Sequence, residues 1–141
     1  MRVERAVIDT NVLISAALSP RSAPTHIVDG LLEHATLMFS RETFEALETR
    51  LWRPKFDRYL DMERRRLLLH DFAAAALWVE LPAPPREQYS RDPDDDVFVH
   101  TALHGSAQWL ISGDRDLLEL PYGLGVEILS PAQALEQWRL G

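Results

Sequence analysis

The stretch Ala6–Asn11, AVIDTN, decides how the rest of the chain is arranged. Its first three residues are apolar and two of them are β-branched, a pattern that predicts a buried strand. The next three, DTN, prefer turns and helix caps, and the apolar segment that continues to Leu18 predicts a helix. Open α/β sheets bind ligands where a buried strand passes into a helix. We therefore expect Asp9 to anchor a metal site that later acidic residues join.

At 141 residues the chain is expected to form one domain, residues 1–141. It is 46% hydrophobic, has no apolar run of about 18 residues that would cross a bilayer, and shows no secretory signal pattern at its start. The absence of cysteine excludes disulfides and thiolate metal sites and favours a cytoplasmic location. The net charge of −7 argues against binding nucleic acid through bulk positive charge, but it allows a nucleic-acid enzyme whose acids are masked by metal ions.

The charges are segregated along the chain. Seven basic residues lie between Arg50 and Arg66, against three acidic residues in the same stretch. Four of the five residues from Asp92 to Asp96 are aspartates, and two more follow in the SGDRD segment, residues 112–116. A basic region and separate acidic foci can attract an anionic polymer and metal cations independently.

Strand-like and helix-like segments alternate along the chain. Apolar and β-branched runs predict strands at residues 3–8, 36–39, 79–81, 109–111 and 126–129. Helical spacing predicts helices at residues 11–18, 24–33, 41–51, 62–78, 93–104, 117–120 and from 131 onward. The expected N-caps are Ser22, Ser40, Asp61, Asp92 and Ser130. The proline-containing segment 82–92 is expected to be a surface connection. This alternation predicts an α/β fold with a mostly parallel central sheet flanked by helices.

Three carboxylates are expected to meet at one edge of that sheet. Asp9 and Asp114 each follow a predicted strand, and Asp96 lies in the first turn of a predicted helix. We choose Asp96 because it is the last of its run and precedes two apolar residues, whereas the earlier aspartates are expected to complement the helix dipole. Converging carboxylates are hard oxygen ligands, which favours Mg²⁺ or Mn²⁺. Such ions polarise a phosphodiester, so the pattern indicates metal-dependent phosphodiester hydrolysis.

Simpler interpretations of single residues stay open. Asp9 and Asn11 can cap the helix that follows them. His100 and His104 are one helical turn apart, but without further ligands a structural role suits them better than metal binding. A phosphatase with Asp9 as nucleophile would need a second aspartate two residues later, where this chain has Asn11. The functional prediction therefore rests on the acids acting together.

Four motifs in combination resemble the PIN-domain family, in the branch of toxins from toxin–antitoxin pairs. They are IDTNVLISA at residues 8–16, RPKFDRYL at 53–60, RDPDDDVF at 91–98 and ISGDRDLL at 111–118, ordered and spaced as in the family over nearly the whole chain. The resemblance implies a three-layer α/β PIN-like fold and a divalent-metal-dependent ribonuclease that leaves a 5′-phosphate. It also implies frequent homodimers and neutralisation by a cognate antitoxin.

By this resemblance Asp9, Asp96 and Asp114 match the first, third and fourth acids of the family. They are the expected catalytic residues and metal ligands, holding one or two Mg²⁺ or Mn²⁺ ions. The residues expected to support them are Asn11, Ser112 and the accessory acid Asp116.

The second acid is where this chain departs from the family pattern. The family has a glutamate immediately before Leu47, and this chain has Ala46. Glu45 is adjacent, about 100° around the helix, and Glu42 is one turn earlier on nearly the same face. We expect Glu45 or Glu42 to take the place of the missing acid.

The sequence thus predicts a small cytoplasmic ribonuclease with an antitoxin partner. The residues expected to contact the RNA backbone are Arg50, Arg53, Lys55 and Arg115. The alternative is a PIN-like module that binds RNA or an antitoxin but cleaves poorly, because Ala46 supplies no carboxylate.

Overall fold

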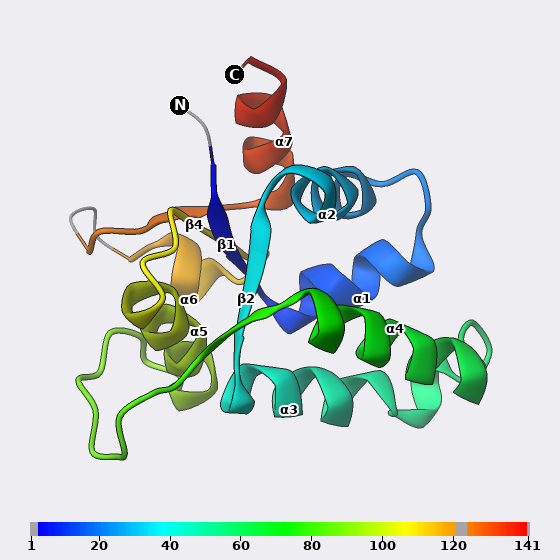
Figure 1. Cartoon of the computed structure of the whole chain (residues 1–141), viewed down its shortest axis with the longest axis horizontal. Helices are drawn as coiled ribbons and strands as arrows, with labels where there is room; N and C mark the ends of the chain where they lie inside the picture. The colour runs from blue at the N-terminus through cyan, green and yellow to red at the C-terminus, as the bar shows by residue number, and fades with distance from the viewer. Residues whose placement is uncertain (1–2, 121–123, 141) are drawn as a thin grey trace.

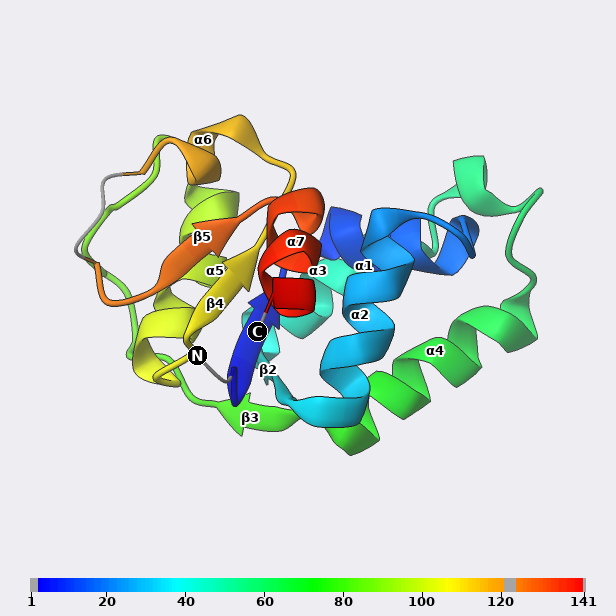
Figure 2. The same ribbon diagram turned by 90° about the horizontal axis from the view of Figure 1, so that it is seen from above.

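A computed structural model describes residues 3–120 and 124–140 of the chain. Its centre is a sheet of five parallel strands in the order β3-β2-β1-β4-β5. β1, which contains the AVI run, is the middle strand and is buried on both faces, as its apolar composition predicts. The strands are β1 (Arg5–Ile8), β2 (Thr36–Ser40), β3 (Leu77–Val79), β4 (Trp109–Ile111) and β5 (Glu127–Leu129) (Figures 1 and 2).

Helices connect the strands and begin at the residues that the sequence marks as caps. Ser22, Ser40 and Asp61 each accept a hydrogen bond from the backbone N–H three residues later, as predicted. The helices of the described residues are α1 (Thr10–Leu18), α2 (Ala23–His34), α3 (Arg41–Leu51), α4 (Met62–Ala75), α5 (Pro93–His104), α6 (Arg115–Leu118), α7 (Pro131–Leu140) and a 3₁₀ helix (Pro54–Phe56).

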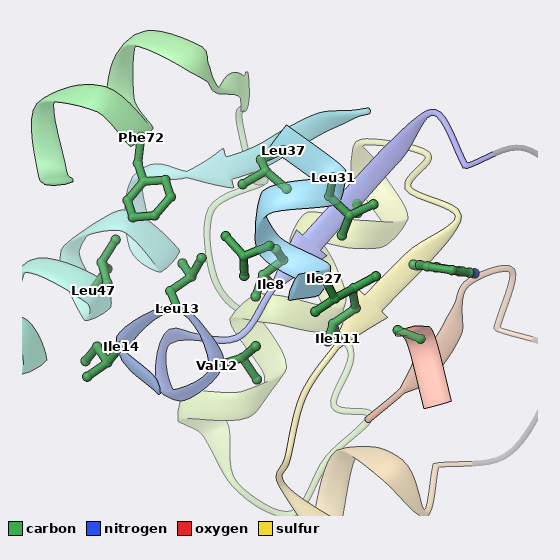
Figure 3. Packing of buried hydrophobic residues seen from close by; sticks show 14 of the residues in the cluster. Ile8, Val12, Leu13, Ile14, Ile27, Leu31, Leu37, Leu47, Phe72 and Ile111 are labelled. Carbon is green, nitrogen blue, oxygen red and sulfur yellow. The ribbon is translucent and has the colours of Figure 1, made fainter. Parts of the chain in front are cut away.

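The sheet separates two apolar clusters, because successive residues of a strand point to opposite faces. Ala6 and Ile8 pack with α1, α2 and α7 on one face, whereas Val7 packs with α5 and α6 on the other. The first cluster also includes side chains of α3 and α4, and Figure 3 shows Ile8 and Ile111 facing the side chains of α1 and α2. Figure 2 shows the strands between these two groups of helices. The predicted three-layer α/β fold is therefore confirmed.

The third strand and the helix before it differ from the prediction. α4 ends at Ala75, where the Ala- and Leu-rich sequence predicted helix to residue 78, and β3 spans Leu77–Val79 rather than 79–81. Ala76 is already extended, with ψ of 147°, and β3 pairs in parallel with Met38–Ser40 of β2. Pairing at the edge of the sheet thus overrides the helical propensity of this segment.

The segment between β3 and α5 is a long connection without regular structure, as its prolines predict. Among the described residues, no helix combines the length and the apolar character that crossing a bilayer requires.

We expect Leu31→Ala to lower the free energy of unfolding by about 2–5 kcal/mol, because this fully buried side chain lies in the first cluster and its truncation leaves a cavity. The matched control is Leu32→Ala on the same helix. Leu32 is 41% exposed, so its truncation should change stability by no more than about 0.5 kcal/mol. Urea unfolding followed by circular dichroism measures both variants. Equal losses would contradict the way α2 faces the sheet.

Candidate metal centre

A cleft of about 480 Å³ opens at the carboxyl ends of β1 and β4. These strands are neighbours, with Ile8 beside Ile111, and the strand order reverses here because β2 lies on the other side of β1. Such a switch point leaves a crevice beyond the strand ends. The walls of the cleft come from the β1–α1 junction, α3, the start of α5 and the loop after β4. Each of the four sequence motifs contributes at least one lining residue.

Asp9 lies between β1 and α1, at the N-cap position of α1. In the described structure its side chain makes no capping hydrogen bond with α1, and its Oδ2 atom instead accepts one from Ser112 Oγ at 2.7 Å. Burial raises the pKa of Asp9, since only 6% of the residue is exposed, and the charge of Asp114 adds to this effect. The Ser112 hydrogen bond, the backbone N–H of Asn11 and the Arg50 charge act in the opposite direction and lower this pKa. Asp9 is therefore a buried carboxylate in an acidic surrounding.

Ser112 connects the acids that follow the two strands. Besides donating to Asp9, its Oγ atom accepts a hydrogen bond from the backbone N–H of Asp114 at 2.9 Å. Asp114 Oδ1 in turn accepts from the N–H of Asp116 at 2.8 Å, so Asp114 also caps the short helix α6. This chain of hydrogen bonds holds the strand-end acids in fixed relative positions across two strands.

Asp95 is the buried acid of α5 that lines the cleft, beside the exposed Asp92 and Asp94, whereas Asp96 does not line it. Asp95 is 8% exposed and lines the cleft, and one ligand atom each of Asp95, Asp114 and Asp116 lies within 4.8 Å of the others. Asp96 Oδ1 instead accepts hydrogen bonds from the backbone N–H groups of Tyr89 and Ser90, at 3.1 and 2.6 Å. The structure thus places Asp96, the residue chosen from the sequence, outside the cleft lining, where its carboxylate holds the connection before α5.

Helical periodicity explains why Asp95 faces inward. Asp95, Phe98, Val99 and Ala102 follow the i, i+3, i+4, i+7 spacing of one helix face, and all four are buried. Asp96 lies about 100° further around the helix, toward the connection. Phe98 and Val99 are apolar, which predicts that they face the core, and Asp95 precedes them by three and four residues on the same helix face. This spacing is the sequence signal that could have identified Asp95.

The surroundings of Asp95 suit a cation. Burial, followed by the charges of Asp114, Asp92 and Asp9, raises the pKa of Asp95 from the ordinary aspartate value of 3.8 to about 7. Its Oδ2 atom is buried and has no hydrogen-bond partner among the described residues. A divalent cation would satisfy that oxygen and offset the repulsion between the carboxylates. The donor set is of oxygen atoms alone, the ligand type that Mg²⁺ and Mn²⁺ prefer.

On α3, Ala46 lines the cleft where the family pattern has a glutamate, and both candidate replacements are engaged in ion pairs. Glu45 pairs with Arg41 at 3.1 Å on the exposed surface of the helix. Glu42 pairs with Arg86 of the connection at 2.8 Å, and this pair is partly buried. Both glutamates line the cleft, and Arg86 is a contact that no local sequence signal could have predicted.

The four basic residues chosen from the sequence divide into two groups. Arg50 and Arg53 line the cleft, and Arg50 Nη1 donates to Asn11 Oδ1 at 2.6 Å. Lys55 lies over the ring of Phe56 and does not line the cleft. Arg115 is exposed, lies 3.8 Å from Glu119 and is also outside the lining.

Thr10 was not selected from the sequence. It lines the cleft next to Asp9 and is 3% exposed, and its hydroxyl has no hydrogen-bond partner among the described residues.

Comparison with known proteins gives matches over most of the chain. The family model described as PIN domain matches residues 5–116. The uncharacterized protein MJ1680 of Methanocaldococcus jannaschii is 32% identical over 120 residues, which cover 82% of this chain and 74% of that protein.

Solved structures are similar in fold at low sequence identity. PAE2754 from Pyrobaculum aerophilum superposes with a TM-score of 0.66 at 15% identity, over 98% of this chain and 91% of that one. VapBC2 from Rickettsia felis, bound to a DNA fragment from their promoter, gives 0.62 at 12% identity, over 89% and 98%. FitAcB from Neisseria gonorrhoeae gives 0.58 at 21% identity, over 90% and 98%.

We expect Asp95→Asn to change how the stability of the metal-free protein depends on pH. Because the pKa of Asp95 is about 7 when folded and lower when unfolded, the folded state binds the extra proton between about pH 4 and 7. The stabilisation that this proton gives the folded wild-type protein is therefore present below pH 4 and lost as the pH rises to 7. The variant has no such loss, so its melting temperature relative to wild type should increase over this range.

Differential scanning calorimetry in chelator measures this effect, with Asp29→Asn, an exposed carboxylate on α2, as the matched control. A constant difference in melting temperature between wild type and Asp95→Asn from pH 4 to 8 would contradict the prediction.

Proposed function

The chain belongs to the PIN domain family, and on that premise we propose that it is a divalent-metal-dependent ribonuclease, the toxin of a toxin–antitoxin pair. The observation that carries this proposal is the buried Oδ2 atom of Asp95, which has no hydrogen-bond partner among the described residues. Asp95 forms a carboxylate group with Asp114 and Asp116, and both Asp95 and Asp114 line the same cleft as Asp9. Crowded acids of this kind are stable together when a cation lies between them.

Asp9, Asp95 and Asp114 are the proposed ligands of Mg²⁺ or Mn²⁺, with Asp116 as an accessory acid. When bound, such an ion polarises the phosphodiester and lowers the pKa of a water molecule. Ser112 keeps Asp9 oriented through its hydrogen bond, and the same hydroxyl sets the position of Asp114. The rigid ends of β1 and β4 thus fix the acids before substrate arrives, which is the condition for efficient electrostatic catalysis.

Arg50 and Arg53 are the proposed contacts for phosphate groups at the cleft. Both extend from the segment at the end of α3, so they face the acids from the other wall. Arg50 also donates to Asn11, which orders both side chains beside Asp9. Two cations next to a strongly acidic centre would hold the anionic strand while the acids hold the metal. Lys55 and Arg115 lie outside the cleft lining. They are the proposed contacts for the part of the RNA that extends beyond the cleft.

A cognate antitoxin and a second copy of the chain are the proposed protein partners. The four sequence motifs resemble the toxin branch of the family, which supports the antitoxin. The likeness in fold to VapBC2 of Rickettsia felis, a structure determined with promoter DNA, is consistent with membership of such a pair.

The second candidate function is binding of RNA or of an antitoxin with little cleavage. The observation in its favour is α3, where Ala46 supplies no carboxylate and both nearby glutamates are held by arginines. In this case the centre would hold fewer metal ligands than an active nuclease requires.

We expect Asp9→Asn and Asp95→Asn each to lower the metal-dependent cleavage of RNA by more than about 100-fold. Changing a residue that only orients a metal ligand costs about 10- to 100-fold, and loss of a ligand itself should exceed that range. The matched control is Asp96→Asn, which changes an adjacent residue whose carboxylate accepts hydrogen bonds from the connection and does not line the cleft. It should keep most of the activity. The assay follows a labelled RNA with Mg²⁺, Mn²⁺ or chelator, and circular dichroism checks folding. Loss of activity in Asp96→Asn alone would overturn the assignment of Asp95.

We expect Ala46→Glu to raise the cleavage rate by about 100-fold, the scale of one well-placed electrostatic group. The control is Thr49→Glu, which adds the same charge to the same wall of the cleft one turn along α3. A gain specific to position 46 supports a weakened nuclease. If Ala46→Glu gives no gain and Glu42→Gln abolishes cleavage, Glu42 is the acid in use and the binding-module alternative is excluded.

A further inference from the structure

A second hollow, of about 420 Å³, lies beside α5 and is separate from the acidic cleft. On α5 it is lined by His100 and His104, which follow Asp95 by five and nine residues and therefore lie about 140° and 180° around the helix from it. The connection before α5 supplies Arg86, Glu87 and Tyr89. None of these side chains belongs to the proposed metal centre.

Aromatic rings are the main feature of this hollow. His100 and His104 stack, with ring centroids 5.9 Å apart and planes at 18°, and the Tyr89 ring lies 5.3 Å from His100. His100 is buried, whereas His104 at the end of the stack is exposed. Unpaired nucleic-acid bases bind to proteins by stacking on tyrosine and histidine rings of this kind.

A metal ion fits this hollow less well than a planar ring does. His100 Nε2 lies 2.7 Å from the carbonyl oxygen of Glu87, and because a carbonyl can only accept, this nitrogen carries a proton. It is therefore not available as a metal ligand. Glu87 in turn accepts a hydrogen bond from the Tyr89 hydroxyl at 3.0 Å.

Arg86 joins the second hollow to the acidic cleft. It lines the hollow, and its Nη2 atom donates to Glu42, a lining residue of the cleft, at 2.8 Å. Its Nε atom donates to the carbonyl of Pro82 at 2.6 Å, which fixes the guanidinium between the two sites. A guanidinium has five N–H donors and these two bonds use two of them, so it can also contact a phosphate group.

We infer that the second hollow is a subsite for a nucleotide several positions along the strand from the cleaved bond, in which a base stacks on the His104 ring and Arg86 lies under one of the intervening phosphates. The inference deepens the proposed ribonuclease function and rests on it. His104 is about 13.5 Å along the axis of α5 from Asp95. Stacked nucleotides rise by about 3.4 Å each, so a dinucleotide at the metal centre is too short to reach His104, whereas a longer strand reaches it.

The test compares His104→Ala with the matched control His70→Ala, an exposed histidine on α4 that lines neither site. Fluorescence anisotropy in chelator measures the affinity of wild type and variants for a labelled single-stranded RNA of about 12 nucleotides, within the range of single-strand binding sites. Cleavage of the same RNA and of a dinucleotide is measured with Mn²⁺.

We expect His104→Ala to weaken binding of the longer RNA by about 5- to 100-fold, the range for loss of one stacking ring, with unchanged dinucleotide cleavage. Tyr89→Leu should act in the same direction and Tyr89→Phe should not, because the ring is what is lost. His70→Ala should leave both measurements unchanged.

The outcomes separate the subsite from the nuclease function. Metal-dependent cleavage without any effect of His104→Ala on the longer RNA overturns the subsite and leaves the nuclease function intact. Binding that depends on His104, without cleavage, supports the subsite and rejects the nuclease. The absence of RNA binding by wild type overturns both.

Discussion

The repulsion among carboxylates at the ends of β1 and β4 is the constraint on which the rest of the molecule depends. Asp9, Asp95 and Asp114 lie in one cleft, and each raises the pKa of a neighbour or has its own raised. Burial and neighbouring negative charges both disfavour the charged form of a carboxyl group, so ionising all three together costs free energy. Their coexistence requires hydrogen bonds that hold them, a cation that binds them, or protons that neutralise them.

The scaffold supplies the first of these. Ser112 links Asp9 to Asp114, and the backbone N–H of Asp9 donates to the carbonyl of Ile111, so hydrogen bonds join the ends of the two strands. The two apolar clusters pack against both faces of β1. Burial of their side chains stabilises the fold and offsets the repulsion among the carboxylates. Such a local conflict of charge in an otherwise consistent fold is typical of functional sites.

The wall formed by α3 is the variable part of this arrangement. Ala46 packs against the cluster around Val7, so the position of the family's second acid serves packing in this chain. Glu42 instead forms an ion pair with Arg86, a residue of the long connection. Through this ion pair the connection contacts a wall of the acidic cleft, and it also lines the second hollow. Two of its backbone N–H groups donate to Asp96, which holds a segment without regular structure in one position.

The sequence alone determined the parallel α/β architecture, the caps at Ser22, Ser40 and Asp61, and the proximity of Asp9 and Asp114, because these follow from local periodicity and from the rule that parallel strands end at one edge. It did not determine the end of α4, since alanine favours helix and only the neighbouring β2 makes residues 77–79 a strand. The choice between Asp95 and Asp96 also belonged to the tertiary structure. Both are in the first turn of α5, and which one faces the cleft depends on the rotation of the helix that buries Val99 against the sheet. The pairing of Glu42 with Arg86 was equally out of reach, because contacts between distant segments leave no pattern in the local sequence.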